Sequence, residues 1–486
     1  MSINSPPSLF DVAILSLLRD DTSAIAALEC LPINLFPPLF KVAITGGHFK
    51  TVTAMVGAWP FHFLALGSLL VAEEPHQEIL KAALDGLDVL FGQKVRPRRW
   101  RLQVLDLRKK IDTSSWNAGS GTLVRSSVYF AEEPVYAQLR QRRQNMEHSK
   151  LGEKQPIVSV QVLIDMRIRK CDEFLTFLIE RVRQRKGLMR LCCKNLAFVD
   201  MPSQISLIEN ILQAVQLDFI QILTINCTWD LFILARIAPY LGCMFKLRRL
   251  ILCRITTRFF NSEAEDREVE TSLAQFAAQF FHLHQLKELL LLSVHCLEGH
   301  LDQVLSCLAS PLETLWITDC LISDSDLTYL TVCSNTSQLN SFHLRDVVLT
   351  NVNPELLQSL LMRASTTLHF LDWSGCGITD SQLTSILPSL GHCSQLQFFK
   401  FSGSLVSMTV LERLLRYTLP LCNFQCLELP VPVECYVENT GILHQDTLEL
   451  HMDKIRQILQ ELERCSQDVK SCYHSSIAYD SIVLNF

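Results

Sequence analysis

One short stretch of the sequence carries residue types that could hold a metal ion. The segment HCLEGH (295–300) contains two histidines and a glutamate, and imidazole and carboxylate groups are ordinary zinc ligands. No second group of such residues lies near it in the sequence, and the segment falls where a predicted strand turns into a predicted helix. We therefore expect a structural turn here, with no metal and no other cofactor.

The sequence also lacks the short motifs that mark common catalytic sites. It contains no Walker loop, no G-x-S-x-G nucleophile elbow, no H-E-x-x-H helix and no C-x-x-C pair. With no visible residues to carry catalysis, the sequence favours a non-catalytic binding protein over an enzyme.

Composition narrows the class of protein further. The chain has 486 residues, of which 48% are hydrophobic and 19% are charged, and a net charge of −6. This composition excludes wholesale disorder. Apolar runs stay below the roughly 18 residues of a membrane helix, and the mildly acidic balance provides no general attraction to nucleic acid. We expect neither a membrane nor nucleic acid as a direct partner.

The cysteines indicate a reducing compartment. The N-terminus has no basic region of the kind that opens a signal peptide, and Asp11 interrupts its apolar stretch. The 18 cysteines are therefore expected to be reduced and mostly buried as small apolar residues. This predicts a cytoplasmic protein, with the nucleus as a further location.

The C-terminal half of the chain contains an internal repeat, which determines where its surface residues lie. Four segments fit the template L-x-x-L-x-L-x-x-C, whose positions we number one to nine: LETLWITDC (312–320), LNSFHLRDV (339–347), LHFLDWSGC (368–376) and LQFFKFSGS (396–404). Their starts are 27, 29 and 28 residues apart, which is the period of leucine-rich repeats. Each repeat predicts a short strand, a turn and a returning helix. The fold class is therefore α/β, a leucine-rich repeat solenoid shaped like the ribonuclease-inhibitor horseshoe.

Looser copies extend this pattern towards the N-terminus. They are GLMRLCCKNL (187–196), IQILTINCTW (220–229), LRRLILCRI (247–255), LKELLLLSV (286–294) and LQVLDLRKK (102–110). Following the template, Cys320 and Cys376 at position nine should lie buried in the turn after their strands. The inner face of the helix after the third segment should hold apolar side chains at helical spacing: Ile378, Leu383, Ile386, Leu387 and Leu390.

Two polar stretches interrupt the repeats. Residues 112–154 are small, polar or charged and predict a flexible loop, with RQRR (140–143) as a solvated linker or a nuclear-import patch. An acidic insertion at about 258–270, which contains NSEAEDREVE, predicts a solvated loop or an extended helix on the rim; a recognition element is the alternative. We expect an N-terminal helical region at 1–95, the solenoid at 96–430, and a C-terminal cap and tail at 431–486.

The N-terminal segments leave two interpretations open. SLFDVAILSL (8–17) predicts an apolar helix, and FPPLF (36–40) follows it. Such a helix can cap the first rung of a solenoid, or it can dock another protein. Both roles are compatible, because a cap has an outer face.

Four long strings are spread from residue 24 to 396: AIAALECLPINLFPPLFKVAI, LDGLDVLFGQKVRPRRWRLQVLDLRKK, LMRLCCKNL and CGITDSQLTSILPSLGHCSQL. These strings resemble the PRAME family, the leucine-rich tumour-testis antigens that include the oogenesins. The resemblance implies a curved solenoid that acts as the substrate receptor of a cullin-2 ubiquitin ligase, with roles in transcriptional repression.

The resemblance also implies two docking motifs near the N-terminus. An elongin BC-box places a leucine and a small residue on one face of a helix, and the matching residues here are Ser8, Leu9, Ala13 and Leu17. A cullin-2 box of the form Φ-P-x-Φ-x-x-x-Φ is matched by Phe36, Pro37, Leu39 and Ala43, with Leu31-Pro32 as an alternative register. These predict elongin B/C and cullin-2 as partners.

Three functions remain open from the sequence. The chain is a ligase subunit that holds a client protein, a binding module that blocks a partner without any ligase, or a corepressor that acts through its client. The client is unknown. The concave side chains expected to meet it are Glu313, Trp316, His343, Arg345, Asp372, Lys400 and Ser402.

Overall fold

The computed structural model describes residues 9–69, 76–93, 97–108, 159–169, 173–185, 187–201, 203–257, 263–437, 442–462, 468–472 and 480–486. These residues form two compact units. The first comprises the described residues within 1–165, 172–193 and 214–216, and the second comprises those within 166–171, 194–213 and 217–486. The predicted flexible loop at 112–154 lies outside the described residues.

The first unit combines helices with a small parallel sheet. Its helices are α1 (Leu9–Leu18), α2 (Asp21–Ala27), α3 (Phe36–Thr45), α4 (Phe49–Gly57), α5 (His76–Gly92) and α8 (Glu173–Gln184), and its strands pair in the order β1 (Phe63–Ala65), β2 (Val104–Asp106), β3 (Val160–Leu163) and β5 (Met189–Cys192). Strand β1 already lies inside the region 1–95 that the sequence suggested was helical.

Aromatic packing and proline geometry fix the start of this unit. Two prolines stand in the first turn of α3, where the fixed proline φ suits a helix and no hydrogen-bonding amide is lost. Phe36 and Phe40 of this helix pack against Trp59, with ring centroids 6.2 and 5.0 Å apart, respectively. All three side chains are buried.

The second unit contains the repeats. Among the described residues, its sheet has 12 strands, in the order β15-β16-β14-β13-β12-β11-β10-β9-β8-β7-β6-β4. The parallel strands are β4 (Met166–Ile168), β6 (Asn195–Val199), β7 (Ile222–Asn226), β8 (Arg249–Cys253), β9 (Glu288–Leu292), β10 (Thr314–Thr318), β11 (Ser341–Arg345), β12 (Phe370–Asp372), β13 (Phe398–Lys400) and β14 (Cys426–Pro430). The strands β15 (Asp468–Cys472) and β16 (Ser481–Asn485) close the end of the sheet in antiparallel pairing.

The register confirms the predicted repeat. Position four of each of the four template segments pairs with position four of the next: Leu315 with Phe342, Phe342 with Leu371, and Leu371 with Phe399. The four segments are therefore adjacent parallel strands of one sheet.

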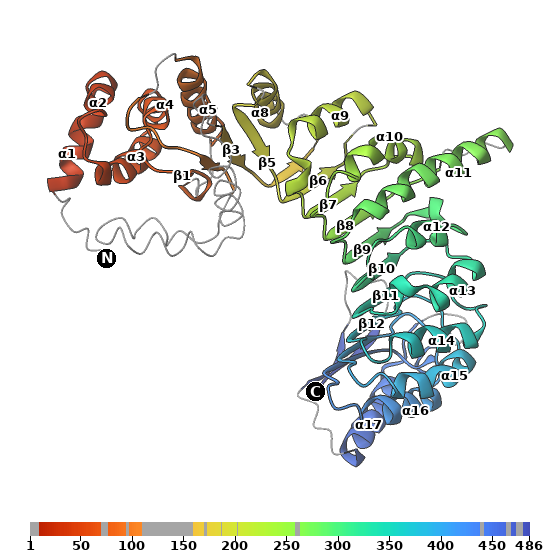
Figure 1. The fold of residues 1–486 in the computed structure, drawn as a ribbon. Coiled ribbons are helices and arrows are strands. Elements are labelled where there is room, and N and C mark those ends of the chain that lie inside the picture. Colours follow the sequence, from red (N-terminus) through yellow and green to blue (C-terminus); the bar gives the residue numbers. More distant parts are fainter. Residues whose placement is uncertain are drawn as a thin grey trace. The chain divides into compact units, whose positions relative to one another are not determined.

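Helices cover one side of this sheet and leave the other side open (Figure 1). They are α9 (Ile205–Ala214), α10 (Leu231–Leu241), α11 (Glu263–Ala277), α12 (Leu301–Ser306), α13 (Asp324–Val332), α14 (Pro354–Ala364), α15 (Asp380–Gly391), α16 (Met408–Thr418) and α17 (Gln445–Glu461). The five apolar residues predicted for the inner face at 378–390 are all buried. No helix among the described residues combines the length and apolarity needed to cross a bilayer.

The turn after most of the repeat strands has a recurrent backbone geometry. Position eight has a positive φ in seven repeats: Asp200, Arg254, Ser293, Asp319, Asp346, Gly375 and Gly403. Glycine adopts this left-handed conformation freely, and aspartate tolerates it better than most residues. The chain reverses here, which allows position nine to point back into the core.

Buried thiols complete two of these turns, as the template predicted for Cys320 and Cys376. The Cys376 thiol donates to Leu344 O of the preceding repeat at 2.8 Å, and the Cys320 thiol accepts from the Val294 amide at 3.3 Å. Burial raises the pKa of Cys376 to about 12. The group therefore stays a neutral thiol and bridges two repeats by hydrogen bonding.

Residues 263–270 of the acidic insertion form the first part of helix α11, in agreement with the extended-helix alternative, and residues 258–262 lie outside the described residues. Arg267, Glu268 and Glu270 lie in its N-terminal part and are exposed. Leu273 and Phe276 lie further along the helix and are buried. Only the second part of α11 therefore packs on the repeats.

Two substitutions in α11 test this division. Leu273→Ala removes a fully buried side chain and should lower the free energy of unfolding by about 2–5 kcal/mol. Glu270→Ala changes an exposed position of the same helix and should stay within about 0.5 kcal/mol of the parent. Chemical denaturation of both variants measures the difference, and equal losses would contradict the division.

Candidate functional site

Helix α1 presents the candidate elongin box on its outer side. Leu9 is 91% exposed, Ala13 is exposed, and Leu17 is half-buried, whereas Ile14 and Leu18 of the same helix are buried. Ser8 lies outside the described residues. The helix thus anchors itself with one face and offers the other face to solvent.

The exposed residues of α1 are unusually apolar for a surface. Phe10, Val12 and Leu15 are also exposed, so exposed large apolar side chains gather within a single helix. Contiguous exposed apolar surface commonly marks a protein interaction site.

The candidate cullin box has a different environment. Phe36, Leu39 and Ala43 are buried in the core of the first unit, and Pro37 is half-buried. Their side chains hold α3 in place and do not form a free surface. In the alternative register, Pro32 is exposed and Leu31 is half-buried. Contact between a cullin and the buried residues would be indirect, through the shape that they give to this helix.

On the open side of the repeat sheet, position five forms a continuous line across neighbouring strands. In strand order, Trp316 lies opposite His343, His343 opposite Asp372, Asp372 opposite Lys400, and Lys400 opposite Glu428. Four of the residues predicted for the concave face are therefore neighbours, although each comes from a different repeat.

Aromatic rings from neighbouring strands stack on the same face, two from position five and two from position three. The centroid distances are 4.4 Å from Trp316 to His343, 4.8 Å from His343 to Phe370, and 5.5 Å from Phe370 to Phe398. We name these four residues the aromatic row. Phe370 and Phe398 were not predicted from the sequence as surface residues of this face. Their signal in the sequence is an aromatic residue at position three in two consecutive repeats.

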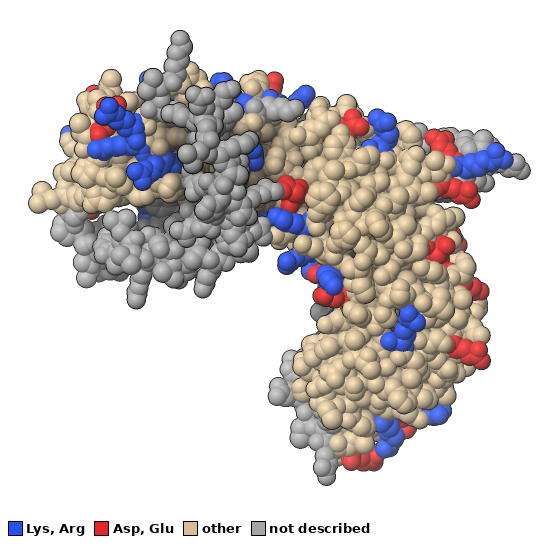
Figure 2. Space-filling model, in the orientation of Figure 1, with Lys and Arg blue, Asp and Glu red and all other residues tan. Residues whose placement is uncertain are grey.

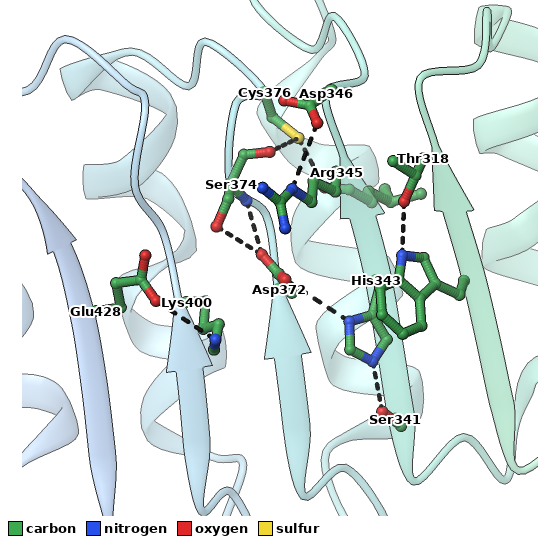
Figure 3. Close-up of polar contacts among 12 residues, drawn as sticks. Thr318, Ser341, His343, Arg345, Asp346, Asp372, Ser374, Cys376, Lys400 and Glu428 are labelled. Atoms are coloured by element: carbon green, nitrogen blue, oxygen red, sulfur yellow. Dashed lines mark hydrogen bonds and ion pairs between the residues drawn. The ribbon is translucent and has the colours of Figure 1, made fainter. Parts of the chain in front are cut away.

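His343 is the buried centre of a polar group (Figure 3). Its Nε2 lies 2.7 Å from the Ser341 hydroxyl, and its Nδ1 lies 3.8 Å from a carboxylate oxygen of Asp372. The Ser374 hydroxyl and amide donate to Asp372 at 2.6 and 3.0 Å. Burial alone would raise the pKa of Asp372, but the interactions with His343 and Ser374 outweigh it and hold the pKa below its ordinary value.

The order of hydroxyl, imidazole and carboxylate is that of a serine-hydrolase triad, but the surroundings do not suit catalysis. The amides of Asn340 and Ser341 donate to Glu313 O at 2.8 and 3.0 Å, so they cannot stabilise an oxyanion. Rings stack on both sides of the imidazole of His343. The group rigidifies the sheet surface instead.

Charged residues around the aromatic row are paired with one another. Lys400 Nζ lies 3.5 Å from Glu428, Lys287 Nζ lies 3.4 Å from the exposed Glu313, and Arg345 Nε lies 3.4 Å from Asp346. This surface therefore combines partly exposed aromatic rings with charges that are already neutralised.

One predicted contact residue has a different place. Ser402 follows β13 and is fully buried. It cannot touch a client, and the concave set is corrected accordingly.

The HCLEGH segment forms a short turn of 3-10 helix, His295–Leu297, followed by the start of α12. Cys296 and Leu297 are buried, which is consistent with the structural turn that we expected. Within the described parts of the chain, no three residues of the His, Cys, Asp or Glu types come together in a way that could hold a metal ion.

Basic (Lys, Arg) and acidic (Asp, Glu) side chains are both visible on the face shown in Figure 2.

The chain matches the family model of the PRAME C-terminal domain over residues 158–481 and that of the PRAME N-terminal domain over residues 6–116. The chain belongs to the PRAME family.

Individual relatives agree with this assignment. PRAME family member 12 of Homo sapiens is 44% identical over 90% of this chain and 86% of its own length, and PRAME family member 20 of Homo sapiens is 42% identical over 99% and 98%. Among solved structures, the crystal structure of the yeast Rad7–Elc1 complex covers 62% of this chain and 79% of its own, at 14% identity and a TM-score of 0.33. A likeness that weak carries no argument about partners.

The polar group around His343 makes a testable contribution to stability. The pKa of Asp372 is lowered from 3.8 in the folded state, so its ionised form stabilises the fold above that pH. This contribution should disappear as the pH falls through the lowered pKa. The difference in unfolding free energy between the parent and Asp372→Asn should be largest near neutral pH and shrink below pH 3.8. Urea denaturation across this range measures it, and a difference independent of pH would contradict the assignment.

Proposed function

We propose that the chain is the substrate-recognition subunit of a cullin-2–elongin B/C RING ubiquitin ligase. Helix α1 and the helices after it bind the ligase subunits, and the open face of the repeat sheet binds a client protein. The chain itself performs no chemistry; it brings the client to the ligase.

One observation carries this proposal, namely the outward-facing apolar side of α1. A helix that only capped the unit would turn its apolar residues inward and its polar residues outward. Instead, Leu9 and Ala13 are exposed on the face where the elongin motif requires a leucine and a small residue one turn later. Because Ile14 and Leu18 hold the helix from the other side, this face is free to insert into a groove.

The client side of the proposal rests on the aromatic row. Aromatic residues dominate the energetics of protein interfaces, and here the sheet fixes their positions before any partner arrives. The ion pairs around them remain satisfied, so the free surface carries little uncompensated charge. Such a surface favours a client segment with apolar or aromatic side chains.

Substitutions on α1 test the elongin contact. Leu9→Ala and Ala13→Glu should abolish copurification of elongin B/C without changing the melting temperature, because both side chains are exposed. Loss of a leucine anchor removes on the order of 2 kcal/mol or more of binding, and a buried glutamate without a partner is costly. The measurement is affinity purification of the tagged chain with thermal unfolding of each variant.

Leu15→Ala is the matched control for these variants. Leu15 is also an exposed leucine of α1, but it lies about 120° around the helix from Leu9. It should leave elongin recovery unchanged. Full elongin recovery in Leu9→Ala and Ala13→Glu would remove the ligase function and leave a binding module or a corepressor.

A separate substitution tests the cullin contact. Leu39→Ala empties a buried position and should lower the melting temperature whatever its effect on binding, so it cannot serve alone. Lys41→Glu changes an exposed residue of the same helix and should reduce cullin-2 recovery while elongin recovery persists. Unchanged cullin-2 recovery would show that this face of α3 is not the contact.

A further inference from the structure

The edge of the repeat sheet at which the strands end carries a row of exposed apolar side chains. They occupy position ten, the residue after the buried position nine, in successive repeats. Leu321 is 53% exposed, Val348 is 74% exposed, and Leu405 is 73% exposed. Val433, which follows β14, is 39% exposed. We name these four residues the edge row.

Backbone hydrogen bonds beyond the strands keep these turns in register. The amide of Asp319 donates to Arg345 O at 2.9 Å, that of Asp346 to Ser374 O at 2.9 Å, and that of Gly375 to Ser402 O at 2.8 Å. The Val433 amide donates to Val406 O at 3.0 Å, which places Val433 beside the repeat that contains Leu405. The residues of the edge row therefore follow one another along a single edge.

The core does not require apolar side chains at these positions. The next residue in three of the repeats already supplies the buried apolar contact, since Leu349, Ile378 and Val406 are almost fully buried. Isolated exposed leucines and valines are common on proteins. A row of them at one repeat position is different and indicates an interaction surface.

From this surface we propose that the edge row binds a basic amphipathic helix of a partner protein. Neighbouring strands lie about 4.8 Å apart, and an α-helix rises about 5.4 Å per turn. A helix lying across the turns therefore meets roughly one repeat per turn. The row extends over four repeat steps, so an apolar stripe at i, i+3, i+4, i+7 that continues over about four turns can reach its members.

A glycine interrupts the row. Gly377 takes position ten between the repeats of Val348 and Leu405, with a φ of +65°. A Cβ built on it would lie 2.7 Å from the Thr350 hydroxyl, so a side chain is disfavoured there by both space and backbone conformation. The row therefore lacks an apolar side chain at this repeat.

Charge decides which kind of helix fits. The segments 293–300, 319–325, 346–355, 375–381, 403–409 and 430–437 around this edge contain no lysine or arginine. Arg345, which directly precedes one of them, is paired with Asp346. Their acidic residues are Glu298, Asp319, Asp324, Asp346, Glu355, Asp380 and Glu434.

Some of these carboxylates accept hydrogen bonds from backbone amides at the start of a helix. Asp380 accepts from the Ser407 amide at 2.9 Å, and Glu434 accepts from the Met408 amide at 3.1 Å, as expected of carboxylates near helix N-termini. Glu298, Asp324 and Glu355 are exposed and remain available to a partner. Lysine and arginine on the flanks of the bound helix would complement them.

A synthetic peptide tests the proposal directly. The probe is a fluorescent amphipathic helix of about five turns, with leucine at i, i+3, i+4 and i+7 and lysine elsewhere. Fluorescence anisotropy with the full chain should show saturable binding that weakens as salt is added. A scrambled leucine–lysine peptide and a leucine–glutamate peptide of the same pattern should bind about tenfold more weakly or worse.

Variants of the chain locate the binding site. The double variant Val348→Thr with Leu405→Gln should keep its melting temperature and bind the leucine–lysine peptide about tenfold more weakly. Asp324→Asn with Glu355→Gln should weaken binding and flatten its salt dependence. Leu450→Gln, at an exposed leucine of α17, is the control and should bind like the parent.

Three results would overturn the proposal: no binding of the leucine–lysine peptide, equal binding of its scrambled form, or unchanged binding in the edge-row variant. The outcome is independent of the ligase function, since elongin recovery through α1 is measured separately.

Discussion

The turn that follows most repeat strands is the constraint on which the rest of the repeat unit depends. In seven repeats a left-handed residue at position eight turns the chain, and position nine then enters the core. There a thiol such as that of Cys376 reaches back to the preceding repeat. Because this turn recurs with a nearly constant repeat length, each strand meets the next in the same register, and equivalent positions fall into lines.

Those lines create the surfaces that can bind partners. Position five becomes the line from Trp316 to Glu428, position three adds Phe370 and Phe398, and position ten becomes the edge row. No single repeat contains a site. Each surface arises only because neighbouring strands are about 4.8 Å apart, close enough for rings to stack and for opposite charges to pair across strands.

In the first unit, some apolar residues pack in the core and others are exposed to solvent. In α3, Phe36, Leu39 and Ala43 are used entirely for packing. In α1, packing needs only Ile14 and Leu18, which leaves Leu9 and Ala13 free. Two stretches that look equally apolar in the sequence therefore differ in what they can offer a partner. The proposed elongin contact rests on an exposed face, whereas the proposed cullin contact must use residues around a buried core.

The sequence by itself determined the family, the leucine-rich repeat class, the pairing of the four template segments and the burial of Cys320 and Cys376. These features follow from local periodicity, because alternation along a strand and helical spacing after it report which side of an element is apolar. The position of β1 and the aromatic row came only from the tertiary structure. So did the burial of Ser402 and the contrast between the exposed Leu9 and the buried Leu39. Whether an apolar side chain is covered depends on which segments pack against it, and those segments are distant in sequence. Periodicity identifies the apolar face of each element, but only packing decides whether that face is left for a partner.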